Sequence, residues 1–282
     1  MTTSVFGVIG WPIGHSASPA MMNAAFSHMG IDATYVSFAV KPTDVLDALR
    51  GVVALGVRGI NVTIPHKQAV AKAVDVLSEE ARLTGAVNTV RVDSENGRLF
   101  GHNTDIVGWW TSISKHVANQ RGVVTVLGAG GASRAILAAI RMNRPNWEIR
   151  LVSRRVEQAM ELVSMFDSTP AIVAIPWEDR HDAVRTAQMV VNTTPIGMWP
   201  HPLESPIDDP SCLGPNQVVS DLVYRPLETR FLQQAREAGA TAVDGLWMLV
   251  NQGKAAVEYW LSQEPDGRIM RSAALAFLGE RK

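Results

Sequence analysis

Short β-branched runs alternate with longer segments of helical period in the first hundred residues. The patterns at 19–30, opened by a proline, and 43–55, opened by a capping Thr43, predict helices. Strands are predicted at 4–9, 34–40, 57–62 and 86–92. Such alternation predicts a mostly parallel sheet with helices on both faces.

A second strand series follows after residue 120. Its predicted strands are 123–127, 148–153, 171–175, 188–192, 217–223 and 240–243, and helical segments separate most of them. The tail from about residue 245 is helical and lies beyond the second series, so we expect it to pack back on the first domain. A chain of 282 residues is long enough for two such α/β domains.

The composition limits the classes of partner that the protein is expected to bind. Lys and Arg number 26 against 27 for Asp and Glu, so no broad field would attract nucleic acid or an anionic membrane. The single Cys212 cannot form an intrachain disulfide, and the first residues lack a signal peptide's pattern. No apolar run approaches the roughly 18 residues that span a bilayer. We therefore expect a cytoplasmic protein with a small-molecule ligand, and the residues do not choose between a monomer and a homodimer.

A glycine-rich loop carries the clearest local chemistry. The strand 123–127 leads into Gly128, Gly130 and Gly131 and then into an Ala-rich helix. Glycines let a dinucleotide's pyrophosphate approach the backbone, and the N–H groups that open the helix bind its charge. Ser133 stands where the fingerprint has Gly or Ala, and it is small enough for close packing. The alternative is a plain strand-to-helix turn.

The end of the next strand indicates which dinucleotide the glycine loop would bind. An NAD site usually carries an acid at this strand's end, whereas here Arg154 and Arg155 follow Ser153. Guanidinium groups can hold a 2′-phosphate by charge-assisted bonds, so NADP is favoured over NAD. The alternative is a solvated basic helix start.

The stretch 61-NVTIPHK-67 places polar groups directly after an apolar strand. The carboxyl ends of parallel strands commonly form sites, and a partly buried lysine can exchange a proton with a reacting hydroxyl. Lys67 is therefore a candidate acid–base residue. The alternative is a solvated lysine in the first turn of a helix.

Other segments add candidate ligands. Asp105 lies at the start of a predicted helix, where its commonest use is an N-cap, and Asn88 is predicted to lie in a strand. Ser16 and Ser18 precede Pro19 and a helix, where hydroxyl and N–H groups can bind a carboxylate or simply cap the helix.

Taken together, these motifs resemble the shikimate dehydrogenase family over almost the whole chain. The matches in order are 16-SASP-19, 61-NVTIPHK-67, 85-GAVNT-89, 102-HNTD-105, 128-GAGGASRA-135, 192-NTTPIGM-198, 221-DLVYRPLET-229 and 244-DGLWMLVNQG-253. The resemblance implies NADP-linked reduction of 3-dehydroshikimate to shikimate on the route to aromatic amino acids. It also implies a discontinuous substrate-binding domain, 1–106 completed by 245–282, and a Rossmann-type domain over 107–244, with the site in the cleft between them.

The resemblance also implies roles for individual residues. Lys67 and Asp105 would form the catalytic pair. The substrate ligands would be Ser16, Ser18, Thr63, Asn88, Asp105, Tyr224 and Gln252. The NADP contacts would be Gly128, Ala129, Gly130, Gly131, Ala132, Ser153, Arg154, Arg155, Thr193, Gly245 and Met248.

Some positions depart from the family pattern. Met22 stands where the family often has His, Arg155 is an addition beside Arg154, and Trp247 replaces a usual Gly near the expected nicotinamide. These changes leave quinate or aminoshikimate open as substrates, and a catalytically silent NADP-binding regulator is a further alternative. His15, His66 and His102 lack the spacing and company of metal ligands, so no metal is expected.

Overall fold

The computed structural model describes residues 3–14, 16–117, 122–166 and 170–280. The chain divides into two compact units, unit 1 over Met1–Gly108 with Leu249–Lys282 and unit 2 over Trp109–Met248. The expected boundaries were 106/107 and 244/245. The observed ones fall inside two helices, α5 (Asp105–Ile113) and α10 (Leu246–Leu261).

Unit 1 contains a mixed sheet of order β2-β1-β3-β5-β6-β4. Its strands are β1 (Ser4–Gly10), β2 (Ala33–Ala39), β3 (Gly59–Val62), β4 (Val76–Leu77), β5 (Thr89–Val92) and β6 (Leu99–His102). β1 pairs in parallel with β2 and β3, whereas β5 runs antiparallel to both β3 and β6. The antiparallel pairs and the short β4 and β6 were not predicted. Asn88 also lies one residue before β5 rather than inside the strand.

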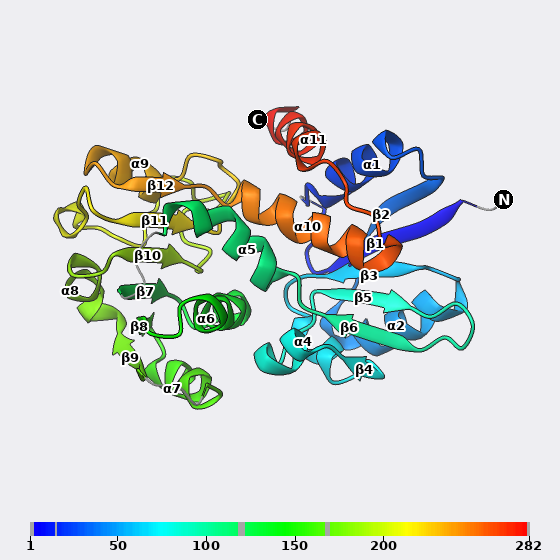
Figure 1. The fold of residues 1–282 in the computed structure, drawn as a ribbon, viewed down its shortest axis with the longest axis horizontal. Helices are drawn as coiled ribbons and strands as arrows, with labels where there is room; N and C mark the ends of the chain where they lie inside the picture. The colour runs from blue at the N-terminus through cyan, green and yellow to red at the C-terminus, as the bar shows by residue number, and fades with distance from the viewer. Residues whose placement is uncertain (1–2, 15, 118–121, 167–169, 281–282) are drawn as a thin grey trace. The chain divides into compact units, whose positions relative to one another are not determined.

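Helices cover both faces of this sheet. They are α1 (Ser18–His28), α2 (Val45–Ala54), α3 (Lys67–Ala71), α4 (Glu79–Thr84) and α11 (Gly267–Glu280), with the unit's parts of α5 and α10. On one face, Leu49 and Val52 of α2 join a core with Ile60 and Val62 of β3. On the other, Phe6 packs against Phe26 of α1 at 5.3 Å and Trp260 of α10 at 5.0 Å between ring centroids. The C-terminal α11 lies beside α1 (Figure 1).

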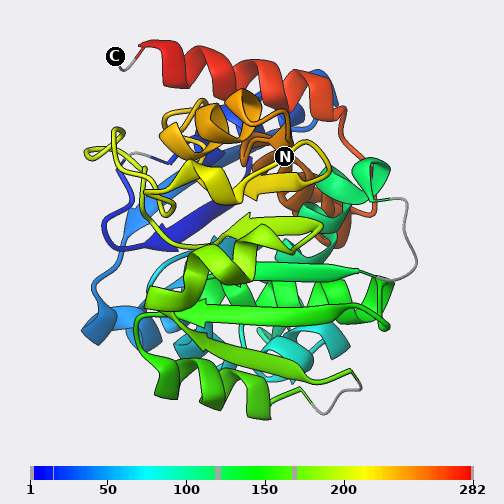
Figure 2. The same ribbon diagram turned by 90° about the vertical axis from the view of Figure 1, so that its left-hand side faces the viewer.

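Unit 2 contains a parallel sheet of order β12-β11-β10-β7-β8-β9. The strands are β7 (Val123–Leu127), β8 (Glu148–Ser153), β9 (Ile172–Pro176), β10 (Met189–Asn192), β11 (Val218–Asp221) and β12 (Thr241–Val243). The helices are α6 (Gly131–Asn143), α7 (Val156–Ser164), α8 (Arg180–Arg185) and α9 (Arg230–Glu237). One sheet face carries α8 and α9, and the other carries α6 (Figures 1 and 2). The strand order reverses between β7 and β10, which is where ligands bind in doubly wound folds.

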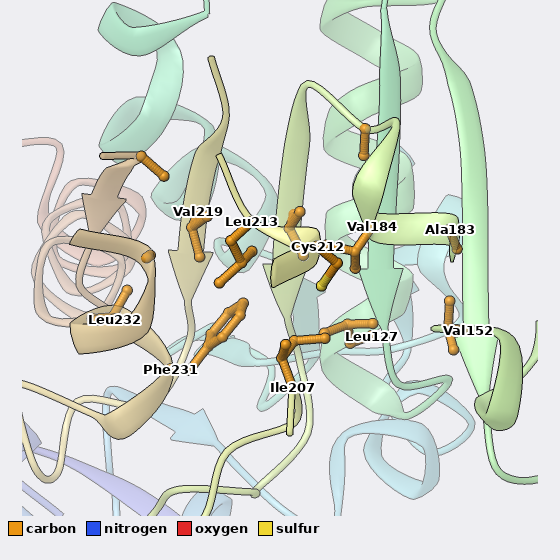
Figure 3. Close-up of a cluster of buried hydrophobic side chains, with 14 residues drawn as sticks. Leu127, Val152, Ala183, Val184, Ile207, Cys212, Leu213, Val219, Phe231 and Leu232 are labelled. Carbon is orange, nitrogen blue, oxygen red and sulfur yellow. The ribbon is translucent and has the colours of Figure 1, made fainter. Parts of the chain in front are cut away.

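A buried cluster supports the end of β7. Its members include Leu127, Val184 of α8 and Phe231 of α9, together with Ile207 and Cys212 from the long connection after β10 (Figure 3). The loop after Leu127 is thereby held on a rigid base. No helix among the described residues is long and apolar enough to cross a membrane.

Candidate functional site

Three strand ends of unit 1 meet at one edge of its sheet. Asn61 of β3 is opposite Thr89 of β5, and Thr89 is opposite His102 of β6. Because β5 is antiparallel to its neighbours, its beginning lies beside the ends of β3 and β6. The segment after β3, Asn88 and the start of α5 are therefore neighbours although they are far apart in sequence.

Lys67 and Asp105 form an ion pair at this edge. Lys67 Nζ lies 2.5 Å from Asp105 Oδ2, and the two side chains are 17% and 8% exposed. Asn88 Nδ2 donates a hydrogen bond of 2.8 Å to the other carboxylate oxygen, Oδ1. Such charge-assisted bonds are stronger than neutral ones. Lys67 is thus not a solvated lysine, although α3 does begin with it.

The helix-capping alternative for Asp105 also fails. α5 begins at Asp105, and its backbone N–H donates to Asn103 Oδ1 at 3.1 Å. The neighbouring Asn103 therefore binds the freed backbone group. Its own Nδ2 donates to the carbonyl of Ala86 at 2.9 Å, which fixes the amide's orientation. The carboxylate of Asp105 is left for Lys67 and Asn88.

The other predicted substrate ligands of unit 1 lie on elements that flank this edge. Thr63 follows β3 directly and is half-buried, and Ser16 Oγ accepts from Ser18 N–H at 3.2 Å where α1 begins. Gln252 lies on α10, whose backbone is so close to Gly108 that a Cβ there would come within 2.7 Å of Gln252 Cβ. Among the described residues, no side-chain hydrogen bond joins these four residues to Lys67 or Asp105.

The glycine loop of unit 2 has the shape that a pyrophosphate requires. Gly128 has φ +106°, and a Cβ on it would come 2.7 Å from Thr193 Oγ1. At Gly130 and Gly131 a Cβ would meet nothing within 4 Å, so the space over the start of α6 is open. The helix-opening N–H groups face a site without side chains, as anion binding needs. Ala129 and Ala132 keep the rest of the loop small.

Ser133 helps to fix this loop. Its Oγ donates to the Gly128 carbonyl at 2.8 Å and lies 3.0 Å from Thr193 Oγ1. Thr193 Oγ1 also donates to the Leu127 carbonyl at 2.8 Å. The ends of β7 and β10 are therefore tied together at the switch point, and Ser133 fits where the fingerprint has Gly or Ala.

The two arginines follow β8 as predicted. Ser153 is buried, and its Oγ accepts from the Arg155 N–H at 3.1 Å. Arg154 and Arg155 are exposed, and neither forms a salt bridge with a carboxylate of the described chain. Their guanidinium groups are thus available to an anionic ligand. The donor set and the open loop both fit a phosphorylated dinucleotide.

Tyr224, Gly245 and Met248 lie in the later part of unit 2. Tyr224 is half-buried in the loop after β11. A Cβ on Gly245 would come 2.5 Å from the Leu222 carbonyl oxygen, so no other residue fits there without a backbone shift. Trp247 and Met248 are both half-buried on the first turn of α10.

A buried carboxylate in unit 2 was not singled out from the sequence. Asp221 ends β11 and accepts hydrogen bonds from Asn192 Nδ2 at 2.9 Å, Val223 N–H at 3.0 Å and Thr229 Oγ1 at 2.7 Å. Burial raises the pKa of Asp221 to about 6, and these three donors oppose the rise. The sequence did carry a signal that could have identified this site: an acid and an amide stand at the ends of two neighbouring apolar strands.

Histidines serve local structure here. His66 Nε2 lies 2.8 Å from the Val40 carbonyl, and His102 Nδ1 lies 2.8 Å from Ser78 Oγ. Within the described part of the chain no three His, Cys, Asp or Glu side chains gather as metal ligands. His15 is outside the described residues.

A six-stranded parallel sheet with a glycine loop at its switch point, and a separate unit with a buried lysine–carboxylate pair, are together typical of a nicotinamide-dependent oxidoreductase. Comparison with known proteins narrows this class. Residues 8–90 match the family model of the shikimate dehydrogenase substrate binding domain, and residues 245–275 match the model of the shikimate 5'-dehydrogenase C-terminal domain.

Full-length relatives agree with these matches. A shikimate dehydrogenase (NADP(+)) of Symbiobacterium thermophilum is 43% identical over 97% of this chain and 94% of its own length. The structure of shikimate 5-dehydrogenase from Thermus thermophilus with NADP(H) and shikimate is 35% identical, covers 97% of this chain and 99% of its own, and has a TM-score of 0.87. A quinate dehydrogenase from Corynebacterium glutamicum in complex with NAD is 31% identical, covers 97% and 99%, and has a TM-score of 0.89. The chain belongs to the shikimate dehydrogenase family.

Proposed function

We propose that this protein interconverts 3-dehydroshikimate and shikimate with NADP as its cofactor, and that Lys67 and Asp105 are the acid–base pair. The observation that carries the proposal is the largely buried Lys67–Asp105 ion pair, with Asn88 bonded to the second carboxylate oxygen. The names of the curated relatives support the same substrate and cofactor.

The pair suits the proton half of the reaction. Oxidation of the substrate hydroxyl removes a hydride from carbon and a proton from oxygen, and reduction returns both. Lys67 gives its proton to the carbonyl oxygen in reduction and takes it back in oxidation. Asp105 holds the ammonium in place through the 2.5 Å contact and also accepts a hydrogen bond from the reacting hydroxyl.

The remaining unit 1 ligands would orient the ring. Ser16 and Ser18, at the start of α1, would bind the substrate carboxylate with their hydroxyl groups. Asn88 and Gln252 would bind ring hydroxyls, with Thr63 nearby. Tyr224 is a further predicted substrate ligand.

Unit 2 would hold the cofactor. When bound, NADP supplies the hydride acceptor. Gly128, Ala129, Gly130, Gly131 and Ala132 would form the pyrophosphate loop, because the space over Gly130 and Gly131 is open. Arg154 would bind the 2′-phosphate, with Arg155 and Ser153 beside it. Thr193, Gly245 and Met248 would complete the contacts towards the nicotinamide.

The test is absorbance of reduced nicotinamide with purified protein, using shikimate or quinate with NADP⁺ or NAD⁺ in all four pairings. We expect the highest kcat/KM with shikimate and NADP⁺. A higher value with quinate or with NAD⁺ would reassign the specificity, and Trp247 and Arg155 would then be the residues to explain it. Binding of NADPH without turnover of shikimate, quinate or aminoshikimate would identify a regulator instead.

A further inference from the structure

A line of buried polar side chains lies behind Asn88 in unit 1. Tyr35 of β2, Asn61 of β3 and Thr89 of β5 are 1%, 7% and 0% exposed. Asn61 points to the opposite sheet face from the apolar Ile60 and Val62, towards Tyr35. Burying three neighbouring polar groups costs free energy unless all of them are hydrogen-bonded. The donor and the acceptor of each of these hydrogen bonds can be assigned in turn.

The assignment of donors and acceptors begins with the side-chain amide of Asn61. Its Nδ2 lies 3.2 Å from the Asn88 backbone carbonyl, an atom that can only accept, so the NH2 group must be on that side. The carbonyl of the Asn61 side chain then faces Tyr35, whose hydroxyl donates to it at 2.7 Å. The same NH2 group donates to Thr89 Oγ1 at 3.0 Å.

Thr89 links Asn61 to the side-chain amide of Asn88. Its oxygen accepts from Asn61, and its single proton can be donated to Asn88 Oδ1 at 3.0 Å, the shorter contact, or to Thr104 Oγ1 at 3.2 Å. The Thr104 backbone N–H also donates to Asn88 Oδ1, at 2.7 Å. The Thr104 hydroxyl is a third possible donor to this oxygen, at 3.2 Å. The Asn88 NH2 group is therefore directed towards Asp105 Oδ1 at 2.8 Å and Thr104 Oγ1 at 3.0 Å.

The opposite orientation would harm the site. A flipped Asn88 would set its carbonyl against the Asp105 carboxylate, two acceptors in contact, and would leave the Thr104 N–H facing an NH2 group. The Asp105 carboxylate would then lose the donor that stabilises its charged form and its position against Lys67.

We propose that Asn61 and Thr89 are positioning residues for the acid–base pair: together with the Thr104 backbone N–H, they hold the Asn88 side-chain amide in the orientation that donates to Asp105. The inference rests on the proposed roles of Lys67 and Asp105. Among the described residues, neither Asn61 nor Thr89 forms a hydrogen bond with Lys67 or Asp105, so each acts through Asn88.

The first test is Thr89→Val, which keeps the shape and removes the hydroxyl. We expect kcat to fall about tenfold, within the range of supporting hydrogen bonds. We also expect the kcat–pH profile to differ from that of the wild type, because the carboxylate loses an ordered donor. Thr89→Ser restores the hydroxyl and should restore both kcat and the profile.

Thr125→Val is the matched control. Thr125 is also 0% exposed and donates a buried hydrogen bond, to the Ala183 carbonyl at 2.7 Å, but it lies in β7 of unit 2 and not in the unit that holds Lys67 and Asp105. We expect it to lower Tm comparably and to leave kcat and the pH profile unchanged. The inference is overturned if Thr89→Val lowers Tm like the control but keeps the wild-type kcat and profile.

A second measurement is independent of turnover. In protein labelled with ¹⁵N-asparagine, the Asn88 NH2 signals, identified by their loss in Asn88→Asp, should exchange slowly with water. Exchange should become faster in Thr89→Val and in Tyr35→Phe, which removes the donor to Asn61. Unchanged exchange in both variants would refute the positioning role. Wild-type protein that turns over neither shikimate nor quinate would refute the proposed function instead, and the exchange rates would still decide the role of Thr89. If Thr89→Val does not fold, Tyr35→Phe serves for the kcat and exchange measurements.

Discussion

The two units build their candidate sites in opposite ways, although both use one edge of a sheet. In unit 1 the site is made of side chains: Lys67, Asn88 and Asp105 are largely buried and bonded to one another. In unit 2 it is made by the absence of side chains, because Gly130 and Gly131 leave the start of α6 open. Proton transfer needs a few atoms held in place, whereas a pyrophosphate needs room and several backbone N–H groups.

The largest effect is expected from variants that remove the acid–base side chains of unit 1. Lys67→Ala removes the group that moves the proton, so kcat should fall by about 10²–10⁴ with the folded state retained. Asp105→Asn should fall within the same range, because the ammonium loses its ionic partner. Lys72→Ala, an exposed lysine at the end of α3, is the control and should keep its kcat. Steady-state kinetics would refute the assignment if both site variants kept most of their turnover.

The second comparison is between two buried carboxylates. Asp105 has a cationic partner, whereas Asp221 has three neutral donors and a pKa raised by burial to about 6. Because the unfolded value is about 3.9, the stability that Asp221 contributes is fully present below pH 4 and is lost as pH rises through about 6. The difference of about two units corresponds to about 3 kcal/mol of unfolding free energy.

Asp221→Asn tests this directly. The variant should be more stable than wild type above about pH 6, and its advantage should shrink towards pH 4. Urea unfolding across pH 4–8 measures the difference, with the exposed Asp182→Asn as control. A variant that is less stable at every pH would show that the three donors hold Asp221 ionised.

The third effect concerns Arg154, which is expected to bind the 2′-phosphate of NADP through its charge. Arg154→Ala should raise the KM for NADP⁺ by about 10- to 100-fold, the worth of a charge-assisted phosphate contact, and leave the KM for NAD⁺ nearly unchanged. Arg185→Ala removes an exposed arginine from α8 of the same unit and should alter neither. An equal rise for both cofactors would mean that Arg154 does not distinguish the 2′-phosphate.

The smallest effect concerns the glycine loop. Gly128→Ala places a Cβ at φ +106° and 2.7 Å from Thr193 Oγ1, so it should cost about 1–2 kcal/mol of stability and raise the KM for NADP⁺. Gly214→Ala is the control, since a Cβ there meets nothing within 4 Å. Thermal unfolding and cofactor titration of the two variants would contradict the close-approach argument if they were indistinguishable.

Much of the framework was predictable from local pattern. The α/β class was confirmed, and relatives that are named as NADP(+) enzymes or were solved with NADP agree with the predicted cofactor. The assignment of individual site residues stays a prediction. The sequence predicted the strand at β5 but not its antiparallel direction, and it missed β6 because a four-residue run carries too little period to identify a strand. It also missed Tyr35, Thr89 and Asp221, since a lone polar residue in an apolar strand gives no sign of its partner.

The sequence by itself determined the glycine loop, the arginines after β8 and the polar segment after β3, because each is a property of consecutive residues. Only the tertiary structure decided that Asn61, Thr89 and Asn88 form one directed line to Asp105. That line depends on strand register, and register is set by burying Ile60, Val62 and Val90 in one core. Packing of distant segments therefore selects which polar atoms meet, and no local pattern carries that information.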